Sequence, residues 1–110
     1  MTQDFYCDEV LSGNTQVRKV IETETVLAYH HTRPSYTHHI VVIPKIHVQS
    51  LISEEADNNE ALLLALMTVI KSVAADLTRT TGSAKIITNL GEYQDSKHLH
   101  WHVVSGEKIR

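Results

Sequence analysis

The stretch HLHWHVV, residues 98–104, alternates histidine with apolar residues and has the pattern of a half-buried strand. Successive side chains of a strand point to opposite faces, so the three histidines would form a row on one face. Three imidazoles in a row can bind a metal, or supply a nucleophile with neighbouring hydrogen-bond donors. The spacing leaves both chemistries open. The residues that alternate with the histidines would face the core: Leu99, Trp101 and Val103.

Four segments upstream of this stretch also have strand character. Residues 39–44, HIVVIP, are β-branched and almost entirely apolar, as in a central strand buried on both faces. Residues 17–22 and 25–30 predict two strands joined by a turn, and residues 85–89 predict a short one. A polar loop, residues 90–97, leads into the histidine stretch. The sequence therefore predicts five strands.

A long helix is predicted before residues 85–89. Asp57 with Glu60 fits a capping box, and Gly82 supplies a C-terminal stop. Between these limits apolar residues recur at three- and four-residue spacing over about 22 residues. Residues 4–12 predict a short N-terminal helix. The core-facing stripe of the long helix is Leu62, Leu66, Val69, Val73 and Leu77, widened by Leu63, Met67, Ile70 and Ala74.

These elements predict a single α+β domain over residues 1–110. It would be a mainly antiparallel five-stranded sheet, with the long helix and the short N-terminal helix on one face. A chain of 110 residues can build one two-layer core. The leucine-rich helix has more apolar surface than one small sheet can cover, which predicts a homodimer.

Composition narrows the classes of partner and compartment. The net charge of −3 argues against a nucleic acid or a membrane surface as partner. Cys7 is the only cysteine and cannot form an internal disulfide, which indicates a reducing compartment. The apolar runs fall short of the roughly 18 residues that a membrane span needs. We therefore expect a soluble, cytoplasmic protein.

Three features together resemble the histidine triad (HIT) family. The run H-L-H-W-H-V-V matches the pattern His-φ-His-φ-His-φ-φ, in which φ is apolar. LAYHHTRPSYTHHIVVIPKIH is similar to the family's second signature, and Asn89 matches the asparagine before its active-site loop. The order of strands and helix agrees, so the resemblance covers residues 5–105. It implies a HIT-like fold and the nucleoside phosphoramidase-like (Hint-type) branch.

The resemblance implies hydrolysis of a nucleoside 5′-phosphoramidate or a related AMP-like nucleotide, without a required cofactor, through a nucleotidyl-histidine intermediate. His100 would be the nucleophile that attacks the α-phosphorus, and His102 would donate to a non-bridging phosphate oxygen. His98, supported by His39, would orient the row. Ser96 or Lys97 would assist the departing amine. The substrate-binding residues would be Asn89, Ser96, His31 and Lys97.

Two positions depart from the family pattern. His31 stands where related hydrolases often have an aspartate that binds the ribose hydroxyls, and a neutral imidazole offers only one acceptor. Ser96 lies two residues before the first triad histidine instead of three. Some bacterial relatives also hold a structural zinc, which a mixed set could bind here because a carboxylate can ligate zinc. That set is Asp4, Cys7, His47 and His98.

Other functions stay open at this stage. A nucleotide-binding or regulatory protein with weak or no turnover is one, motivated by His31 and by the altered loop before His98. A dinucleoside polyphosphate hydrolase is another. The third is a metal-dependent enzyme that uses the three triad histidines as ligands. Of the remaining histidines, we expect His30 and His38 to be structural or surface residues.

Overall fold

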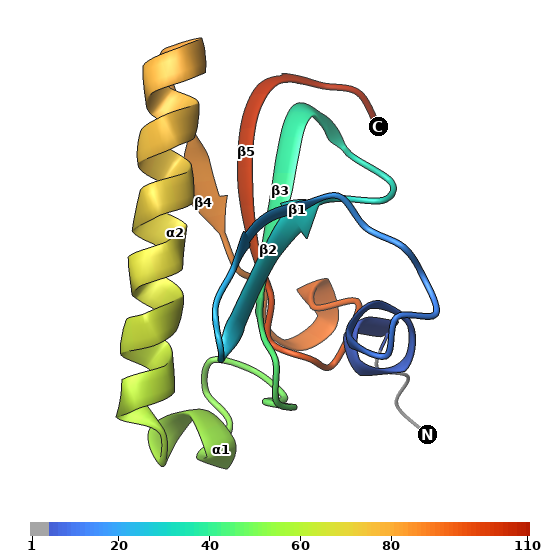
Figure 1. Ribbon diagram of the computed structural model, residues 1–110, viewed down its shortest axis with the longest axis vertical. Coiled ribbons are helices and arrows are strands. Elements are labelled where there is room, and N and C mark those ends of the chain that lie inside the picture. Colours follow the sequence, from blue (N-terminus) through green and yellow to red (C-terminus); the bar gives the residue numbers. More distant parts are fainter. Residues whose placement is uncertain (1–4) are drawn as a thin grey trace.

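The computed structural model describes residues 5–110 and contains one antiparallel sheet with helical segments on both faces (Figure 1). Its strands are β1 (Lys19–Glu22), β2 (Val26–His30), β3 (Tyr36–Pro44), β4 (Lys85–Ile87) and β5 (Trp101–Lys108). Their order across the sheet is β1-β2-β3-β5-β4, which confirms the predicted five-stranded antiparallel sheet. β3 and β5 are neighbours in space although the long helix separates them in sequence.

The two adjacent strands β3 and β5 differ most from their predicted bounds. β3 begins at Tyr36, three residues before the predicted start, and β5 begins at Trp101 and continues to Lys108. Their pairing sets Val41 opposite His102 and His39 opposite Val104. His39 and His102 are therefore diagonal neighbours on one face of the sheet, within reach of each other.

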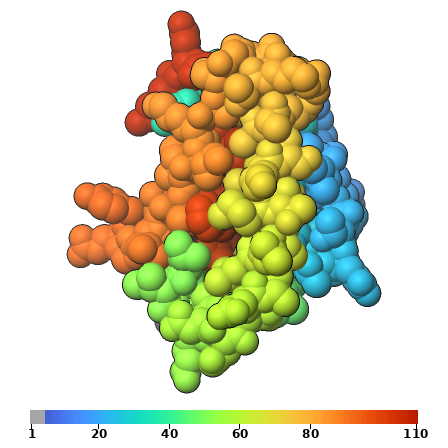
Figure 2. All heavy atoms as spheres, turned by 90° about the vertical axis from the view of Figure 1, so that its left-hand side faces the viewer, coloured from blue at the N-terminus to red at the C-terminus, as the bar shows by residue number. Residues whose placement is uncertain are grey.

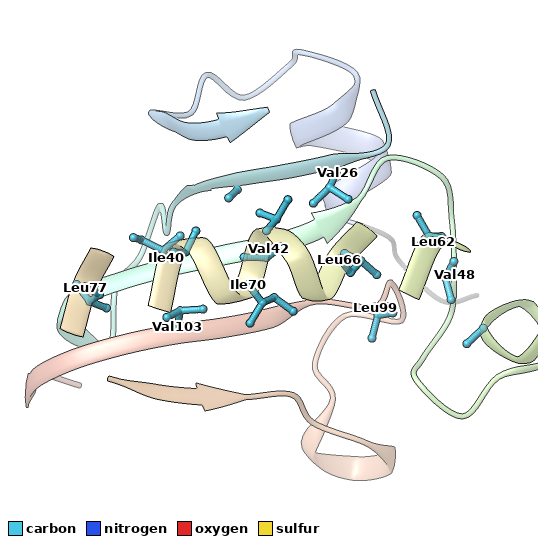
Figure 3. Packing of buried hydrophobic residues seen from close by; sticks show 14 residues of the cluster. Val26, Ile40, Val42, Val48, Leu62, Leu66, Ile70, Leu77, Leu99 and Val103 are labelled. Atoms are coloured by element: carbon cyan, nitrogen blue, oxygen red, sulfur yellow. The ribbon is translucent and has the colours of Figure 1, made fainter. Parts of the chain in front are cut away.

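The long helix α2 (Glu60–Thr81) covers one face of the sheet and forms the main core with it (Figure 3). Alternate residues of β2 and β3 pack against it, together with Leu99 and Val103 from the histidine stretch, and Trp101 lies at the edge of this core. The apolar alternates therefore face the core, as the pattern predicts. The buried stripe of α2 is Leu62, Leu66, Val69, Ile70, Val73 and Leu77.

α2 is more apolar than the sequence pattern suggested. By length and by mean hydropathy, 1.7 over an 18-residue window, this helix alone would be long and apolar enough to cross a membrane. The expectation that every apolar run falls short of a membrane span is therefore wrong for this segment. Because the most apolar stripe of α2 is buried against the sheet, the helix has the packing of a core helix.

The start of α2 also differs from the prediction. Asp57 ends a separate short helix, α1 (Glu54–Asp57), and the capping residue is Asn59, whose side chain accepts a hydrogen bond from the Leu62 amide at 3.1 Å. An asparagine at this place satisfies one of the amides that the first helical turn leaves unpaired. At the other end Gly82 adopts a left-handed conformation with φ 98°, as expected of the predicted stop.

The second face of the sheet is covered by the short N-terminal segment η1 (Tyr6–Leu11). Tyr6 and Val10 pack there against Tyr29, Val41 and other buried residues of β2 and β3. The prediction that this segment lies on the same face as the long helix is wrong, because η1 packs on the opposite face of the sheet. Since β2 and β3 are apolar on both sides, each face needs its own cover. In consequence η1 lies on the face that carries the histidine row.

Candidate active site

The three histidines of the row lie at the start of β5, on the face that η1 covers. His98 and His100 precede the strand and His102 is its second residue. Thr88 donates from Oγ1 to the carbonyl of His100 at 2.8 Å, and the Leu99 amide donates to the carbonyl of Val48 at 2.6 Å. One side-chain and one backbone hydrogen bond therefore hold the backbone of the row, although only its last member belongs to the strand.

A hydrogen bond to the backbone sets the tautomer of His100. Its Nδ1 lies 2.7 Å from the carbonyl oxygen of His98, so Nδ1 carries the proton and donates it. The lone pair of the neutral ring is therefore on Nε2. The ring of Tyr6 packs against the imidazole at a centroid distance of 4.9 Å. The side chain is 5% exposed, so its orientation is set by the protein.

A chain of hydrogen bonds sets the tautomer of His102. The Ser35 amide donates to Nδ1 of His39 at 3.0 Å, which leaves the proton of a neutral His39 on Nε2. That Nε2–H donates to Nδ1 of His102 at 2.8 Å. His102 therefore carries its own proton on Nε2. The result is a fixed N–H donor beside His100.

Burial keeps the rings of His39 and His102 neutral. Desolvation, with a smaller contribution from nearby His31, lowers the pKa of His39 to about 4. Desolvation also lowers the pKa of His102 to about 3, helped by the neighbouring imidazoles of His100, His39 and His31. Near neutral pH both rings are therefore uncharged, and the tautomer of His39 sets the tautomer of His102.

The partner of His39 differs from the one expected. The family resemblance implies that His39 supports His98, whereas in the structure His39 pairs with His102. His98 is fully buried, and its Nε2–H donates to the carbonyl of Pro44 at 3.0 Å. Its Nδ1 then accepts from the thiol of Cys7 at 3.4 Å. His98 thus joins the row to the end of β3 and to η1.

Two adjoining cavities open onto the row. The aromatic cavity, about 420 Å³, is lined by His100 and by four aromatic residues, Phe5, Tyr6, Tyr29 and Tyr93. The basic cavity, about 560 Å³, is lined by His39 and by three cationic residues, Arg33, Lys108 and Arg110. The residues that line both cavities are His31, Arg33, Asn89, Asp95 and His102. His102 therefore stands where the two spaces meet.

The four predicted substrate-binding residues are placed differently. Asn89 and His31 line both cavities, and Ser96 lines the aromatic cavity. The Ser96 hydroxyl is buried and has no hydrogen-bond partner among residues 5–110. Lys97 lines neither cavity, and its ammonium donates to the carbonyls of Gly91 and Gln94, both at 2.8 Å. Lys97 therefore braces the loop before the row.

His31 is also held as a hydrogen-bond donor. The Arg33 amide donates to its Nδ1 at 2.9 Å, so a neutral ring carries its proton on Nε2. Burial is the main cause that lowers the pKa of His31, and the charges of His100, Arg110 and Arg33 add to it. The ring packs beside His39 at a centroid distance of 4.4 Å. This position offers an N–H to a ligand.

Among residues 5–110, two groups of side chains have the spacing of a metal site. The potential ligand atoms of Cys7, His47 and His98 all lie within 4.8 Å of one another. Because His98 Nε2–H donates to a backbone carbonyl, its Nδ1 lone pair faces Cys7, which is the arrangement of a metal-bound histidine. These three residues fit zinc, which would tie η1 to the row. The fourth predicted ligand, Asp4, lies outside the described residues.

The second group, His31, His39 and His102, has similar spacing but the opposite hydrogen bonding. Backbone amides donate to Nδ1 of His31 and of His39, so the remaining nitrogen of each ring carries the proton. A histidine that binds a metal through one nitrogen donates from the other. The second group therefore suits a proton-bearing donor cluster better than a metal.

Several residues of the cavities were not found from the sequence. Tyr6 comes from η1, Lys108 is the last residue of β5, and Arg110 lies two residues after it. Arg110 reaches the site because its guanidinium Nε–H donates to the Pro34 carbonyl at 2.8 Å. For Tyr6 the only local signal in the sequence is the aromatic pair Phe5-Tyr6 before Cys7. No local sequence signal indicates that Lys108 and Arg110 line a cavity.

Comparison with known proteins agrees with this architecture. A 13.2 kDa HIT-like protein of Azospirillum brasilense is 33% identical over 102 residues, which cover 91% of this chain and 84% of the relative. A HIT family hydrolase from Clostridium thermocellum superposes with a TM-score of 0.79 at 25% identity and covers 100% of this chain and 96% of its own. A histidine triad protein from Clostridium difficile has a TM-score of 0.76 at 28% identity, over 100% and 97%. The HIT domain model matches residues 12–109, and the chain belongs to the HIT family.

Proposed function

We propose that this protein is a nucleotide hydrolase that cleaves a nucleoside 5′-phosphoramidate or a related AMP-X compound through a nucleotidyl-His100 intermediate. The observation that carries the proposal is the pair of fixed tautomers. His100 presents a lone pair on Nε2, and His102 presents an N–H on its own Nε2. A nucleophile beside a preorganised donor is what attack on a phosphorus atom needs. The solved HIT family hydrolase among the similar structures supports the reaction class.

In the first step His100 Nε2 forms a bond to the α-phosphorus. The bond from phosphorus to the leaving nitrogen breaks, and that nitrogen keeps the electron pair. The positive charge that His100 gains is stabilised through Nδ1–H, which already donates to the His98 carbonyl. His102 donates to a non-bridging oxygen as negative charge builds there.

The departing amine needs a proton. Ser96 is our candidate donor, because its buried hydroxyl lines the same cavity as His100 and is unpaired among residues 5–110. Lys97 is less suited, since its ammonium is already bonded to two loop carbonyls. In the second step water attacks the phosphorus, the phosphorus–nitrogen bond to His100 breaks, and the ring recovers its lone pair. The water proton returns to Ser96 or to solvent.

The test uses purified protein and adenosine 5′-phosphoramidate. We expect measurable turnover, a loss of about three orders of magnitude or more in His100→Ala, and a covalent AMP adduct in rapidly quenched wild-type protein. His38→Ala is the matched control, because His38 is exposed on β3 and lines neither cavity of the site. Nucleotide binding without an adduct or hydrolysis would instead indicate a binding or regulatory protein. Unchanged turnover in His100→Ala would refute the mechanism.

We also propose that two copies associate through the outer side of α2 and the edge strand β4. Figure 2 views the molecule from this side. Large apolar side chains are exposed on these two elements: Leu64 at 70%, Met67 at 40% and Ile86 at 49%. Exposed apolar area of this kind is typical of an interface. Light scattering should give a dimer for wild type and a monomer for Leu64→Lys with Met67→Lys. Ile52→Lys, which changes an exposed apolar residue before α1, should stay dimeric.

A further inference from the structure

One pair of consecutive histidines lies at the end of β2 and another lies in β3, and one member of each pair takes no part in the proposed hydrolysis. His31 and His39 line the basic cavity, whereas His30 and His38 do not. His30 lies opposite Ile40 in the pairing of β2 with β3, and His38 lies two residues before Ile40. Because Ile40 packs in the core that α2 covers, and alternate residues of a strand share a face, His30 and His38 lie on the α2 side of the sheet.

A groove lies on this side of the sheet, between the C-terminal half of α2 and the edge strand β1. One end is a cavity of about 470 Å³, whose lining includes Arg18, His30 and His38. The other end is a cavity of about 260 Å³, whose lining is mainly apolar and includes Ile21 and Val73. We call the two together the α2–β1 groove. The residues that line both ends are Val20, Ile40 and Asp76.

Positive charge at the larger end of the groove is not balanced by a neighbouring carboxylate. Asp76 is the only carboxylate among the lining residues that the structure describes, and its side chain forms an ion pair with Arg79. No ion pair within residues 5–110 involves Arg18. Burial, and then the positive charges of Arg18 and His38, lower the pKa of His30, so all three groups act on the same space. This end of the groove therefore favours an anion.

We propose that the α2–β1 groove is a second binding site, separate from the hydrolytic site, for an organic molecule with a phosphate head and an apolar body. The Arg18 guanidinium and the His30 imidazole donate to the phosphate oxygens. The apolar body covers Val20, which is 38% exposed, and Ile21 beside it. The site does not depend on whether the protein is a hydrolase.

Other occupants fit the groove less well. A carboxylate carries less negative charge than a phosphate and lacks its third terminal oxygen, so it satisfies fewer of the donors. A bare phosphate leaves the apolar end of the groove unfilled. A metal ion suits His30 and His38 poorly, because neither belongs to a group with metal-ligand spacing in the described part of the chain.

The test titrates hexyl phosphate into the purified protein and follows the histidine ring resonances by NMR. We expect the His30 resonances to shift, with an affinity at least about tenfold higher than that for inorganic phosphate, because the hexyl chain buries apolar surface. Arg18→Gln should lower the affinity about tenfold or more, since a charge-assisted hydrogen bond is lost. The matched control is Lys19→Gln, at the neighbouring exposed residue, which lines neither end of the groove. Val20→Ser should weaken hexyl phosphate about threefold and leave inorganic phosphate unchanged.

A further variant separates the groove from the basic cavity of the candidate active site, which also carries cations. Arg33→Gln with Arg110→Gln removes two of those cations, and neither residue lines the groove, so the His30 shift should persist. Loss of the shift in that variant would place the anion at the active site and overturn the proposal. So would unshifted His30 resonances in wild type, or equal losses of affinity in Lys19→Gln and Arg18→Gln. Equal affinity for hexanoate and hexyl phosphate would overturn the phosphate head.

Discussion

The imidazoles of His39 and His102 form a directed hydrogen bond of 2.8 Å, with Nε2–H of His39 as donor and Nδ1 of His102 as acceptor. The direction follows from the Ser35 amide, which donates to the far nitrogen of His39. A backbone amide on a loop thus determines which nitrogen of His102 carries the proton. We therefore propose that His39 acts through His102, as a positioning residue.

Replacing His39 should therefore lower kcat more than it changes KM. In His39→Ala the Nδ1 of His102 loses its donor, so the ring can move its proton to the wrong nitrogen. We expect kcat to fall about tenfold to a hundredfold, the range for loss of an orienting partner. His102→Ala, which removes the donor itself, should cost about a hundredfold to a thousandfold.

Two readouts test this role. Nitrogen NMR of the His102 ring should show a fixed Nε2–H tautomer in wild type and a mixture in His39→Ala. His38→Ala, from the neighbouring exposed position on β3, should leave both the spectrum and kcat as in wild type. Equal kcat in His39→Ala and His38→Ala would rule out the positioning role.

Acid should destabilise the fold through the same two histidines. Their folded-state pKa values, about 4 for His39 and about 3 for His102, lie below the ordinary value of 6.5. Between the folded-state pKa values and 6.5, the unfolded chain binds more protons than the folded one, so the free energy of unfolding rises with pH. The contribution is complete above about pH 6.5 and is lost as pH falls toward 4 and then 3.

Urea unfolding at a series of pH values checks this sign. The free energy of unfolding should fall as pH decreases from 6.5 to 4, and the slope should be smaller in His39→Gln than in His38→Gln. A steeper slope in His39→Gln than in wild type would contradict the assignment. So would a stability that increases on acidification.

The sequence predicted most elements because their signals are local. Apolar periodicity located α2, and the alternation of residues 98–104 placed Leu99 and Val103 in the core. Tertiary pairings have no such signal. That His39 meets His102 and not His98 depends on the register between β3 and β5, and a shift of this register would change the partner.

The face that η1 covers and the partner of His39 were both predicted wrongly for the same reason, because each depends on tertiary contacts. Periodicity shows that β2 and β3 are apolar on both sides, but not which helical segment covers which side. Periodicity therefore could not predict that Tyr6 lies at the site. The basic cavity depends on contacts between the end of β5 and the loop at Pro34, which are far apart in sequence.

The start of α2 gives a direct test of structure against sequence pattern. Asn59→Ala should lower the free energy of unfolding by about 1 kcal/mol, because the Leu62 amide loses its side-chain acceptor. Asp57→Ala should change it by less than about 0.5 kcal/mol, since Asp57 belongs to α1 and not to the cap. Urea unfolding of both variants decides the point. A larger loss in Asp57→Ala would favour a helix that begins two residues earlier.

Gly106 controls how the end of β5 approaches β3, and hence where Lys108 lies. It has φ 85°, and a Cβ placed on it would lie 2.8 Å from the Cβ of Thr37. Beside it the pairing of β3 with β5 shifts register between Tyr36 and His38. The glycine is therefore required both for its backbone conformation and for the close approach of the two strands.

Gly106→Ala should thus lower the free energy of unfolding by about 2 kcal/mol or more, since positive φ alone costs roughly 1–2 kcal/mol and the contact with Thr37 adds to it. Gly82→Ala is the matched control. Gly82 has φ 98° but no atom within 4 Å of an added Cβ, so only the conformational cost applies. The excess loss in Gly106→Ala, measured by urea unfolding, is the contribution of the strand contact. Equal losses in the two variants would mean that β3 and β5 separate freely at this point, and the fixed position of Lys108 at the basic cavity would then be in error.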